Sequence, residues 1–321
     1  MISLIATVYN EKDNLDQWLD GLLRQTKLPD ELVIVDGGSS DVTWDKLTRR
    51  AEENKLIKVF QHPGNIAAGR NFAIQQAQGD IIAVTDAGCI YDVTWLEKLV
   101  APLAGDASWS ATGFGPWFKD GDNILIYLIA AATIPAPNEF TKPWLPSSRS
   151  VAFKKEVWEK AGGYPEWIPI CEDIIFDLNI IRKIGQPEFI REPLVFWRPR
   201  TTLKSYFNQL FKYTKSDGHG KLWLNRQLTR YVVYLLSLWM LFLSFSFDWK
   251  FILILAVGVL LYSYKFWQRW FVYAGKLSFG QKIFGVLLVP FIVAFGDLAK
   301  MAGWPVGVWE RLSGKIKFPS S

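Results

Sequence analysis

The amino-acid sequence predicts an α/β domain with a mainly parallel, Rossmann-like sheet and helices on both faces, followed by C-terminal transmembrane helices. Two observations support this architecture. Short apolar runs alternate with amphipathic segments from Ile2 to Leu103, as in a parallel α/β sheet. After Arg230 charged residues become sparse and apolar runs follow. We therefore expect a globular domain at residues 1–222 and a membrane anchor with two or three transmembrane helices at residues 223–321.

The first four strands are predicted from continuous apolar runs, namely Ile2–Val8, Leu32–Val35, Ile57–Phe60 and Ile81–Val84. Such runs are typical of parallel strands buried on both faces. Helices are expected in the intervening segments: one with Leu15, Trp18, Leu19, Leu22 and Leu23 on a single face, then Val42–Glu53, Ala67–Gln78 and Thr94–Leu103. Asp41 is expected to be the N-cap of the second helix.

Polar residues stand where three of these strands end. Asn10 and Glu11 follow the first strand, Asp36 the second and Asp86 the fourth. Each alone is a common turn or cap residue. Because open parallel sheets bind ligands at the carboxyl ends of their strands, three such ends with carboxylates favour a binding site.

Several other classes of protein are disfavoured by the composition. The chain has no G-x-G-x-x-G and no G-x-x-x-x-G-K-[ST] segment, which argues against dinucleotide oxidoreductases and P-loop NTPases. Its net charge is +5, and its C-terminal basic residues flank apolar runs, which predicts contact with membrane lipids and not with nucleic acid. Those residues are Lys265, Arg269, Lys276, Lys282, Arg311, Lys315 and Lys317.

The two cysteines and the N-terminus indicate the compartment. Cys89 and Cys171 are too few for a disulfide framework and are expected to be buried, as in a reducing compartment. The start of the chain lacks a basic segment and a signal-peptide pattern. We therefore expect the globular domain to stay in the cytosol.

A series of segments resembles family 2 glycosyltransferases with the GT-A fold, of the membrane-anchored bacterial type. The matching segments are Thr7–Glu11, Val33–Asp41, Gly69–Ile74, Val84–Gly88, Ser147–Phe153, Ala161–Tyr164, Cys171–Asp173 and Gln209–Tyr213. Ser147–Phe153 resembles the strand on the acceptor side, and Cys171–Asp173 resembles the family's "ED" motif. The last segment is a degenerate form of its Q-x-x-R-W motif. The resemblance covers about residues 1–220.

The resemblance implies a donor site for a nucleoside-diphosphate sugar. By position, Asp36 would contact the nucleotide base, and Thr7, Asn10 and Glu11 would shape that pocket. Arg70 would approach the nucleotide or its phosphates, where a fixed cation is useful. The alternative for Arg70 is an ordinary surface arginine on a helix.

The resemblance also implies a divalent cation beside the diphosphate. Asp86 corresponds to the first acid of the D-x-D motif, whereas Gly88 stands at the second, which is usually the direct metal ligand. Mg²⁺ or Mn²⁺ suits carboxylate and phosphate oxygens, so Asp86 is the expected protein ligand. Asp92 and His219 are possible further ligands.

Asp173 is the expected general base. An inverting transfer needs one carboxylate beside the acceptor hydroxyl, and Glu172 would orient Asp173 or raise its pKa. The alternative is that both acids simply open the helix predicted at Ile174–Arg182. The acceptor or diphosphate side would include Glu172, Gln209, Lys212 and Tyr213, where Lys and Tyr replace the family's Arg and Trp.

The C-terminal anchor is predicted from three apolar runs. Tyr231–Phe247 and Phe251–Tyr264 are expected to span the membrane as a hairpin. Three alternatives stay open for Ile283–Phe295: a third span, a re-entrant segment or a helix in the interface. Basic residues after the second and third runs favour an even number of crossings. A shorter apolar segment, Ile124–Ala136, is expected to form a helix before a proline-rich loop that touches the membrane.

Together these features predict an inverting glycosyltransferase at the cytosolic face of the cell membrane. Its acceptor would be a lipid-linked or nascent glycan, as in the synthesis of cell-envelope polysaccharide. Two alternatives stay open: a sugar-phosphate nucleotidyltransferase, and a non-catalytic membrane protein that binds nucleotide sugars.

Overall fold

The computed structural model describes residues 1–140 and 145–316, which form two compact units. The first unit comprises residues 1–117 and 137–198, and the second comprises residues 118–136 and 199–321. Pro143 of the predicted proline-rich loop and Lys317 of the basic cluster lie outside the described residues.

The first unit is built on an eight-stranded mixed sheet of order β3-β2-β1-β4-β7-β6-β8-β5. The four predicted strands form its parallel half. They are β1 (Ile2–Val8), β2 (Glu31–Asp36), β3 (Ile57–Gln61) and β4 (Ile81–Asp86). Leu4 and Ile5 are both fully buried although they point to opposite faces of the sheet, so both faces are covered.

The other half of the sheet contains strands that the sequence pattern did not indicate. They are β5 (Cys89–Tyr91), β6 (Trp109–Pro116), β7 (Val151–Lys154) and β8 (Glu188–Trp197). β7 runs antiparallel to both β4 and β6, and β5 runs antiparallel to β8. Only β7 falls in a segment for which the resemblance implied a strand.

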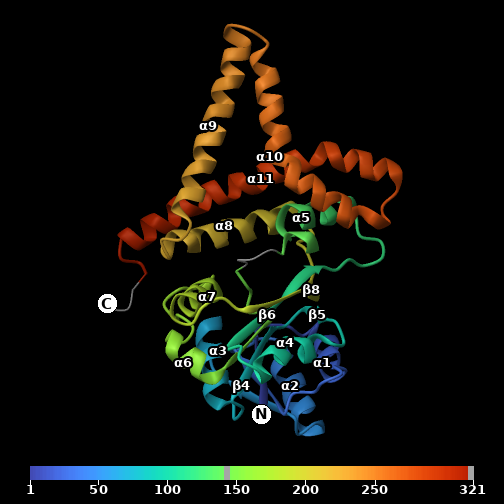
Figure 1. Ribbon diagram of the computed structural model, residues 1–321, viewed down its shortest axis with the longest axis vertical. Helices are drawn as coiled ribbons and strands as arrows, with labels where there is room; N and C mark the ends of the chain where they lie inside the picture. The colour runs from blue at the N-terminus through green and yellow to red at the C-terminus, as the bar shows by residue number, and fades with distance from the viewer. Residues whose placement is uncertain (141–144, 317–321) are drawn as a thin grey trace. The chain divides into compact units, whose positions relative to one another are not determined.

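Helices flank the sheet close to the predicted positions (Figure 1). They are α1 (Leu15–Leu23), α2 (Thr43–Glu53), α3 (Ile66–Gln76), α4 (Trp95–Val100), α6 (Lys155–Ala161) and α7 (Glu172–Lys183), with 3₁₀ turns at Ala101–Ala104 and Pro137–Glu139. The α-helix predicted to reach Leu103 ends at Val100, where the 3₁₀ turn containing Pro102 begins. The N-cap of α2 is Val42 and not Asp41 as predicted; Asp41 lies one residue earlier and accepts a hydrogen bond from the Thr43 backbone N–H at 2.9 Å.

The core of the first unit lies between the sheet and three of these helices. Side chains of β1, β2 and β4 pack against α3, α6 and α7. The contributing residues include Ile5, Val33, Val35, Ile74, Val84, Val157, Phe176 and Ile180. This packing fixes the first turns of α3 and α7 relative to the strand ends.

The second unit is helical. It contains α5 (Ile124–Thr133), α8 (Leu203–His219), α9 (Leu224–Ser246), α10 (Phe251–Tyr273) and α11 (Phe279–Leu312), with a 3₁₀ turn at Ala274–Lys276. Its core joins α5, α8, α10 and α11. The Tyr273 hydroxyl donates to the Pro135 carbonyl at 2.5 Å, which ties α10 to the segment after α5.

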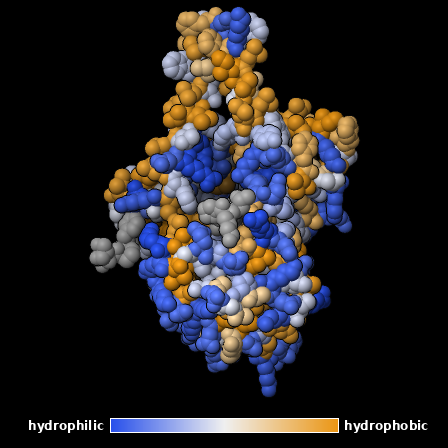
Figure 2. All heavy atoms as spheres, in the orientation of Figure 1, coloured by the Kyte–Doolittle hydropathy of each residue, from blue (hydrophilic) through white to orange (hydrophobic). Residues whose placement is uncertain are grey.

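Among the described residues, three helices are long and apolar enough to cross a membrane: α9, α10 and α11. The first two form a hairpin in Figure 1, and Figure 2 shows apolar residues along it with hydrophilic residues at its tip. In that connection Lys250 is exposed and the side chain of Asp248 is 45% exposed. The third predicted run, Ile283–Phe295, is the middle of α11, which continues through Pro290 and Pro305.

A buried ionic cluster joins these three helices. The Arg230 Nε atom on α9 lies 3.1 Å from Asp297 Oδ1 on α11, and the Lys300 Nζ atom lies 3.0 Å from the same oxygen. The hydroxyls of Tyr234 and Tyr262 donate to Asp297 Oδ2. Charges in an apolar helical unit need such partners, because an unpaired charge there is costly.

The compact units do not follow the division predicted between residues 222 and 223. Helix α8 and the inserted helix α5 share the core of the C-terminal helices. The division into a glycosyltransferase domain at 1–222 and an anchor at 223–321 stays a prediction about function.

Two helical glycines allow a matched test of the packing of α3. A Cβ at Gly69 would lie 2.8 Å from Thr7 Cγ2, whereas a Cβ at Gly21 in α1 would meet nothing within 4 Å. We expect Gly69→Ala to destabilise the protein by about 1–3 kcal/mol, because overpacking outweighs the gain in helix propensity. Gly21→Ala should stabilise it by up to about 1 kcal/mol. Thermal unfolding of both variants checks this, and a higher Tm for Gly69→Ala would contradict it.

Candidate active site

A pocket of about 400 Å³ lies at the carboxyl ends of β1, β2 and β4. It is lined by Thr7, Val8, Tyr9, Glu11, Val35, Gly37, Gly64, Asn65, Ile66, Gly69, Asp86 and Ala87. Strand register explains its position, because Val8 pairs with Asp36 and Thr7 pairs with Asp86. The loops that leave the three strands therefore start from the same edge of the sheet, as the sequence predicted.

Three of the residues predicted for donor binding line this pocket together: Thr7, Glu11 and Asp86. Burial raises the pKa of Glu11, and the nearby carboxylates of Asp41 and Asp86 add to the rise, against a hydrogen bond from Asn14. Asn10 is exposed beside the pocket in a left-handed conformation, and its side-chain oxygen accepts from the Ser40 backbone N–H at 2.9 Å. It thereby joins the loops after β1 and β2.

Asp36 is buried and holds the turn after β2. Its carboxylate accepts hydrogen bonds from the backbone N–H and the hydroxyl of Ser39, at 3.1 and 2.5 Å. Its neighbours Val35 and Gly37 line the pocket, but Asp36 itself is not among the lining residues. Contact between Asp36 and a nucleotide base stays a prediction. The structure shows that Asp36 holds the turn whose residues Val35 and Gly37 line the pocket.

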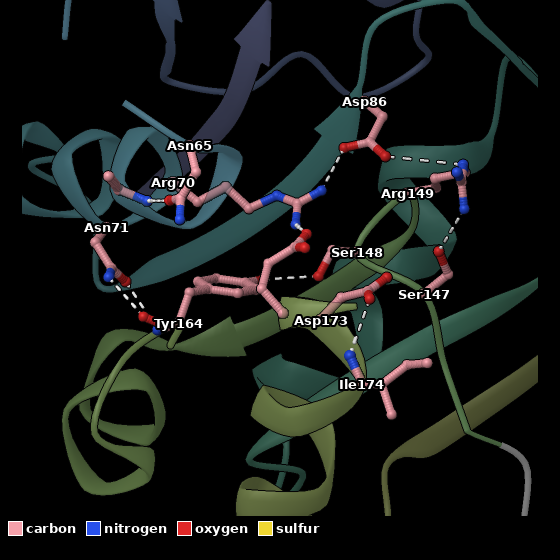
Figure 3. A network of polar contacts seen from close by, with 12 residues as sticks. Asn65, Arg70, Asn71, Asp86, Ser147, Ser148, Arg149, Tyr164, Asp173 and Ile174 are labelled. Carbon is pink, nitrogen blue, oxygen red and sulfur yellow. Dashed lines mark hydrogen bonds and ion pairs between the residues drawn. The ribbon is translucent and has the colours of Figure 1, made fainter. Parts of the chain in front are cut away.

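Arg70 is the buried centre of a charged network (Figure 3). Its two terminal nitrogens bind Asp86 Oδ1 at 2.6 Å and Glu172 Oε1 at 2.5 Å. The guanidinium also lies over the Tyr164 ring, 5.3 Å from its centroid. Arg70 was expected to approach the phosphates or else to be a surface arginine. The surface alternative is wrong, because its side chain is 2% exposed.

The network controls the charge of both acids. Burial would raise the pKa of Asp86, but Arg70 and Arg149 outweigh it and hold that pKa below its usual value. For Glu172 burial dominates: it raises the pKa to about 7 against the opposing charge of Arg70, and Asp173 adds to the rise. Asp86 is therefore held in its ionised form, whereas burial favours the neutral form of Glu172.

Arg149 is a residue of the site to which the sequence gave no role. Its Nε atom lies 3.7 Å from Asp86 Oδ2, and its Nη1 atom donates to the Ser147 hydroxyl at 3.0 Å. Its guanidinium lies over the Trp197 ring, 4.7 Å from the centroid. The only signal was its place in the Ser147–Phe153 segment, which the resemblance assigned to the acceptor side.

Asp173 stands in the first turn of α7, directly after Glu172. It is half-buried, and its Oδ1 atom accepts from the Ile174 backbone N–H at 2.9 Å. Both acids do open the helix, as the structural alternative proposed, but Glu172 also belongs to the Arg70 network. The chain Asp86–Arg70–Glu172 therefore leads from the pocket to the residue next to Asp173.

Asp177, one turn after Asp173, is a second residue that the sequence did not single out. It is fully buried, and neither carboxylate oxygen has a hydrogen-bond partner in the described part of the chain. Burial raises its pKa well above the usual value, and Asp173 and Glu172 add to the rise. Burial without a hydrogen-bond partner among the described residues thus favours the neutral form of Asp177, which lowers the negative charge beside Asp173.

The residues around Asp86 do not form a metal site of their own. Each carboxylate oxygen of Asp86 faces a guanidinium, and Gly88 offers no side chain. Asp92 accepts hydrogen bonds from Thr94, and His219 lies in the second unit, where it pairs with Glu310 at 2.8 Å. Within residues 1–140 and 145–316 no group of three or more His, Cys, Asp or Glu residues is arranged to hold a metal.

The remaining predicted residues lie on α8, in the second unit. The side-chain amide of Gln209 donates to the Tyr213 hydroxyl at 3.0 Å, and Lys212 is exposed. Their role on the acceptor or diphosphate side stays a prediction. Cys89 and Cys171 are buried, as expected, and they do not form a disulfide.

Comparison with known proteins gives a consistent result for the N-terminal part of the chain. Residues 3–143 match the family model described as Glycosyl transferase family 2. The glycosyltransferase AglE of Haloferax volcanii is 33% identical over 108 residues, which is 32% of this chain and 36% of that protein. The O-antigen chain rhamnosyltransferase RfbN of Salmonella typhimurium is 23% identical over 64% of this chain and 70% of its own length. This chain thus spans about a third of the archaeal relative.

A solved structure shows the same fold. The mannosyltransferase PcManGT from Pyrobaculum calidifontis, in complex with GDP-Man and Mn²⁺, superposes with a TM-score of 0.53. The alignment covers 98% of this chain and 87% of that one, at 18% identity. The GT-A fold predicted from the sequence is thereby confirmed.

The Arg70 network yields a test with a matched control. Arg70→Met leaves Asp86 and Glu172 without their shared cation, and we expect a loss of about 3–5 kcal/mol of stability. Arg50→Met removes a more exposed pair with Asp20, whose atoms lie 2.5 Å apart, and should cost less than about 1 kcal/mol. Thermal unfolding measures both, and equal shifts in Tm would show that the network does not stabilise the first unit.

Proposed function

Because residues 3–143 belong to glycosyl transferase family 2, we propose that this protein is an inverting glycosyltransferase. It would move a sugar from a nucleoside-diphosphate sugar to a lipid-linked or nascent glycan acceptor at the cytosolic face of the membrane. The observation that carries this proposal is the chain of contacts from the pocket-lining Asp86 through Arg70 to Glu172, the neighbour of Asp173.

The pocket suits the donor in size and chemistry. Its volume of about 400 Å³ falls within the usual range for small-molecule sites. Thr7, Glu11 and Asp86 offer oxygen atoms to sugar and ribose hydroxyls. The expected Mg²⁺ or Mn²⁺ stays a prediction, and no step below depends on it.

The transfer itself needs one base and a stabilised leaving group. The acceptor oxygen attacks the anomeric carbon of the sugar while Asp173 takes the proton of that hydroxyl. The bond from the anomeric carbon to the phosphate oxygen breaks, and its electron pair leaves with the nucleoside diphosphate. Attack opposite the leaving group inverts the anomeric configuration. In this mechanism Asp173 acts on the acceptor and the pocket holds the departing diphosphate.

The relatives support an acceptor of the cell envelope. One is named for O-antigen synthesis, and another, of Bacillus subtilis, is named as a putative teichuronic acid biosynthesis glycosyltransferase. We propose for this chain a glycan acceptor of that kind, built on or carried by a lipid. The apolar helices α9, α10 and α11 support the membrane location.

The proposed base is tested by Asp173→Asn. We expect the sugar transfer rate of this variant to be at least about 1,000-fold lower, because Asn cannot accept the proton. Its affinity for the donor should change little. Release of nucleoside diphosphate, measured on the purified full-length protein with UDP-, GDP- and dTDP-sugars and lipid-linked acceptors, gives the rate. Asp45→Asn, an exposed acid on α2, is the matched control and should keep full activity.

Three outcomes would contradict the proposal. Release of pyrophosphate from a nucleoside triphosphate and a sugar phosphate would indicate a nucleotidyltransferase. Donor binding without turnover for any acceptor would indicate a non-catalytic binding protein. Full transfer by Asp173→Asn would remove Asp173 from the mechanism.

The membrane topology gives a separate prediction. If α9 and α10 cross as a hairpin from the cytosol, Asp248→Cys at its tip should react with a membrane-impermeant maleimide added to intact cells. Glu52→Cys on the first unit should react only after permeabilisation. The two native cysteines are buried, and the protein without either substitution gives the background labelling. Labelling of Glu52→Cys in intact cells would place the first unit outside the cytosol.

A further inference from the structure

We propose that Arg149 supplies the fixed positive charge beside the donor diphosphate, in the role that a metal ion held by the second acid of D-x-D would have. This inference rests on the proposed function. It assigns to Arg149 a contact with the phosphate groups of a nucleoside-diphosphate sugar.

The side chain of Arg149 is placed for this contact. Its guanidinium lies against the ring of Trp197. Figure 3 shows the same guanidinium between Asp86 and Ser147, which both contact it. Asp86 lines the donor pocket, and Arg149 contacts its Oδ2 atom, so Arg149 lies next to a pocket residue. Stacking on an aromatic ring fixes the plane of a guanidinium and leaves its edge for hydrogen bonds.

Accessibility distinguishes Arg149 from Arg70. The Arg70 side chain is 2% exposed and its terminal nitrogens are bound to two carboxylates, whereas the Arg149 side chain is 28% exposed. Arg70 therefore acts as a positioning residue that orients Asp86 and Glu172. Arg149 does not line the pocket, but it is the more exposed of the two arginines that face the pocket-lining Asp86, and the phosphate contact is therefore assigned to it.

The backbone conformation at position 88 disfavours a metal-binding acid there, so the positive charge beside the diphosphate has to come from another residue. Gly88 has a φ of +80°, a conformation in which a side chain is strained. Without an acid there, Asp86 is flanked by two guanidinium groups, with the nearest atoms at 2.6 and 3.7 Å. A divalent cation at Asp86 would be repelled by both arginines, whereas a diphosphate would be attracted.

Arginine suits the chemistry of the leaving group. When the bond between sugar and phosphate breaks, the departing diphosphate gains a negative charge. A guanidinium can donate two parallel hydrogen bonds to phosphate oxygens, and a fixed donor stabilises that charge in the transition state. Because Asp86 holds Arg149 in place before the donor arrives, little reorganisation is needed.

The test is calorimetric binding of UDP, GDP and dTDP to the full-length protein in detergent, with EDTA and with Mn²⁺. For the nucleotide that binds, we expect EDTA to change the affinity less than about twofold. Arg149→Met should lower the affinity for the diphosphate about 10- to 100-fold, as expected for a charged hydrogen-bonding group. It should leave the affinity for the matching nucleoside, which has no phosphate, within about twofold.

Two further variants separate a direct contact from a structural effect. Arg149→Lys keeps the charge and should restore part of the diphosphate affinity. Arg191→Met removes an exposed arginine of β8 and should change nothing. If Arg149→Met lowers the affinity for the nucleoside as much as the affinity for the diphosphate, Arg149 has a merely structural role and the inference is overturned.

A metal site would also overturn it. Glu11 is the other acid in the pocket, and its Oε2 atom would lie 4.0 Å from a Cβ at position 88. If diphosphate binding requires Mn²⁺, and Glu11→Gln abolishes Mn²⁺ binding measured by electron paramagnetic resonance, the charge comes from a metal. The proposed function would survive that result, whereas failure of the wild-type protein to bind any of the three diphosphates would contradict both.

Discussion

The buried guanidinium of Arg70 joins Asp86 at the pocket to Glu172 on α7, and this bridge sets the geometry of the whole site. Two carboxylates and one cation share a volume from which water is largely excluded, so each group fixes the position of the others. The bridge also connects the parallel half of the sheet, which ends in the donor pocket, with the helix that carries Asp173. Binding and proton transfer are thus held by one network, although the residues are far apart in the sequence.

The parallel half of the sheet could be predicted because its strands are short, continuous apolar runs between amphipathic segments. Ile81–Asp86, for example, is buried on both faces and ends in an acid. The strands β5, β6 and β8 were missed because their pairing is decided by partners distant in the chain. Exposed and buried residues do not alternate along β8, and its register with β6 contains irregularities, so no local period indicates it.

The site was predictable where a residue's role depends on its position at a strand end, as for Thr7, Glu11 and Asp86. It was less predictable where a role depends on a partner. Nothing in the helical segment around Arg70 shows that its side chain is enclosed by Glu172, 102 residues later. Asp177 looks like a surface acid of an amphipathic helix, yet it is fully buried. Arg149 lies in a serine-rich segment, and only the fold brings it to Asp86.

The central claim is that charged side chains from separate parts of the chain form a donor site for a nucleoside diphosphate at the ends of β1, β2 and β4. An experimental structure of the full-length protein with a bound nucleoside diphosphate tests it most directly. The account predicts phosphate oxygens within hydrogen-bonding distance of the Arg149 guanidinium, with Asp173 facing the space beyond the diphosphate. A nucleotide bound elsewhere, or phosphates turned away from both arginine and acid, would contradict it.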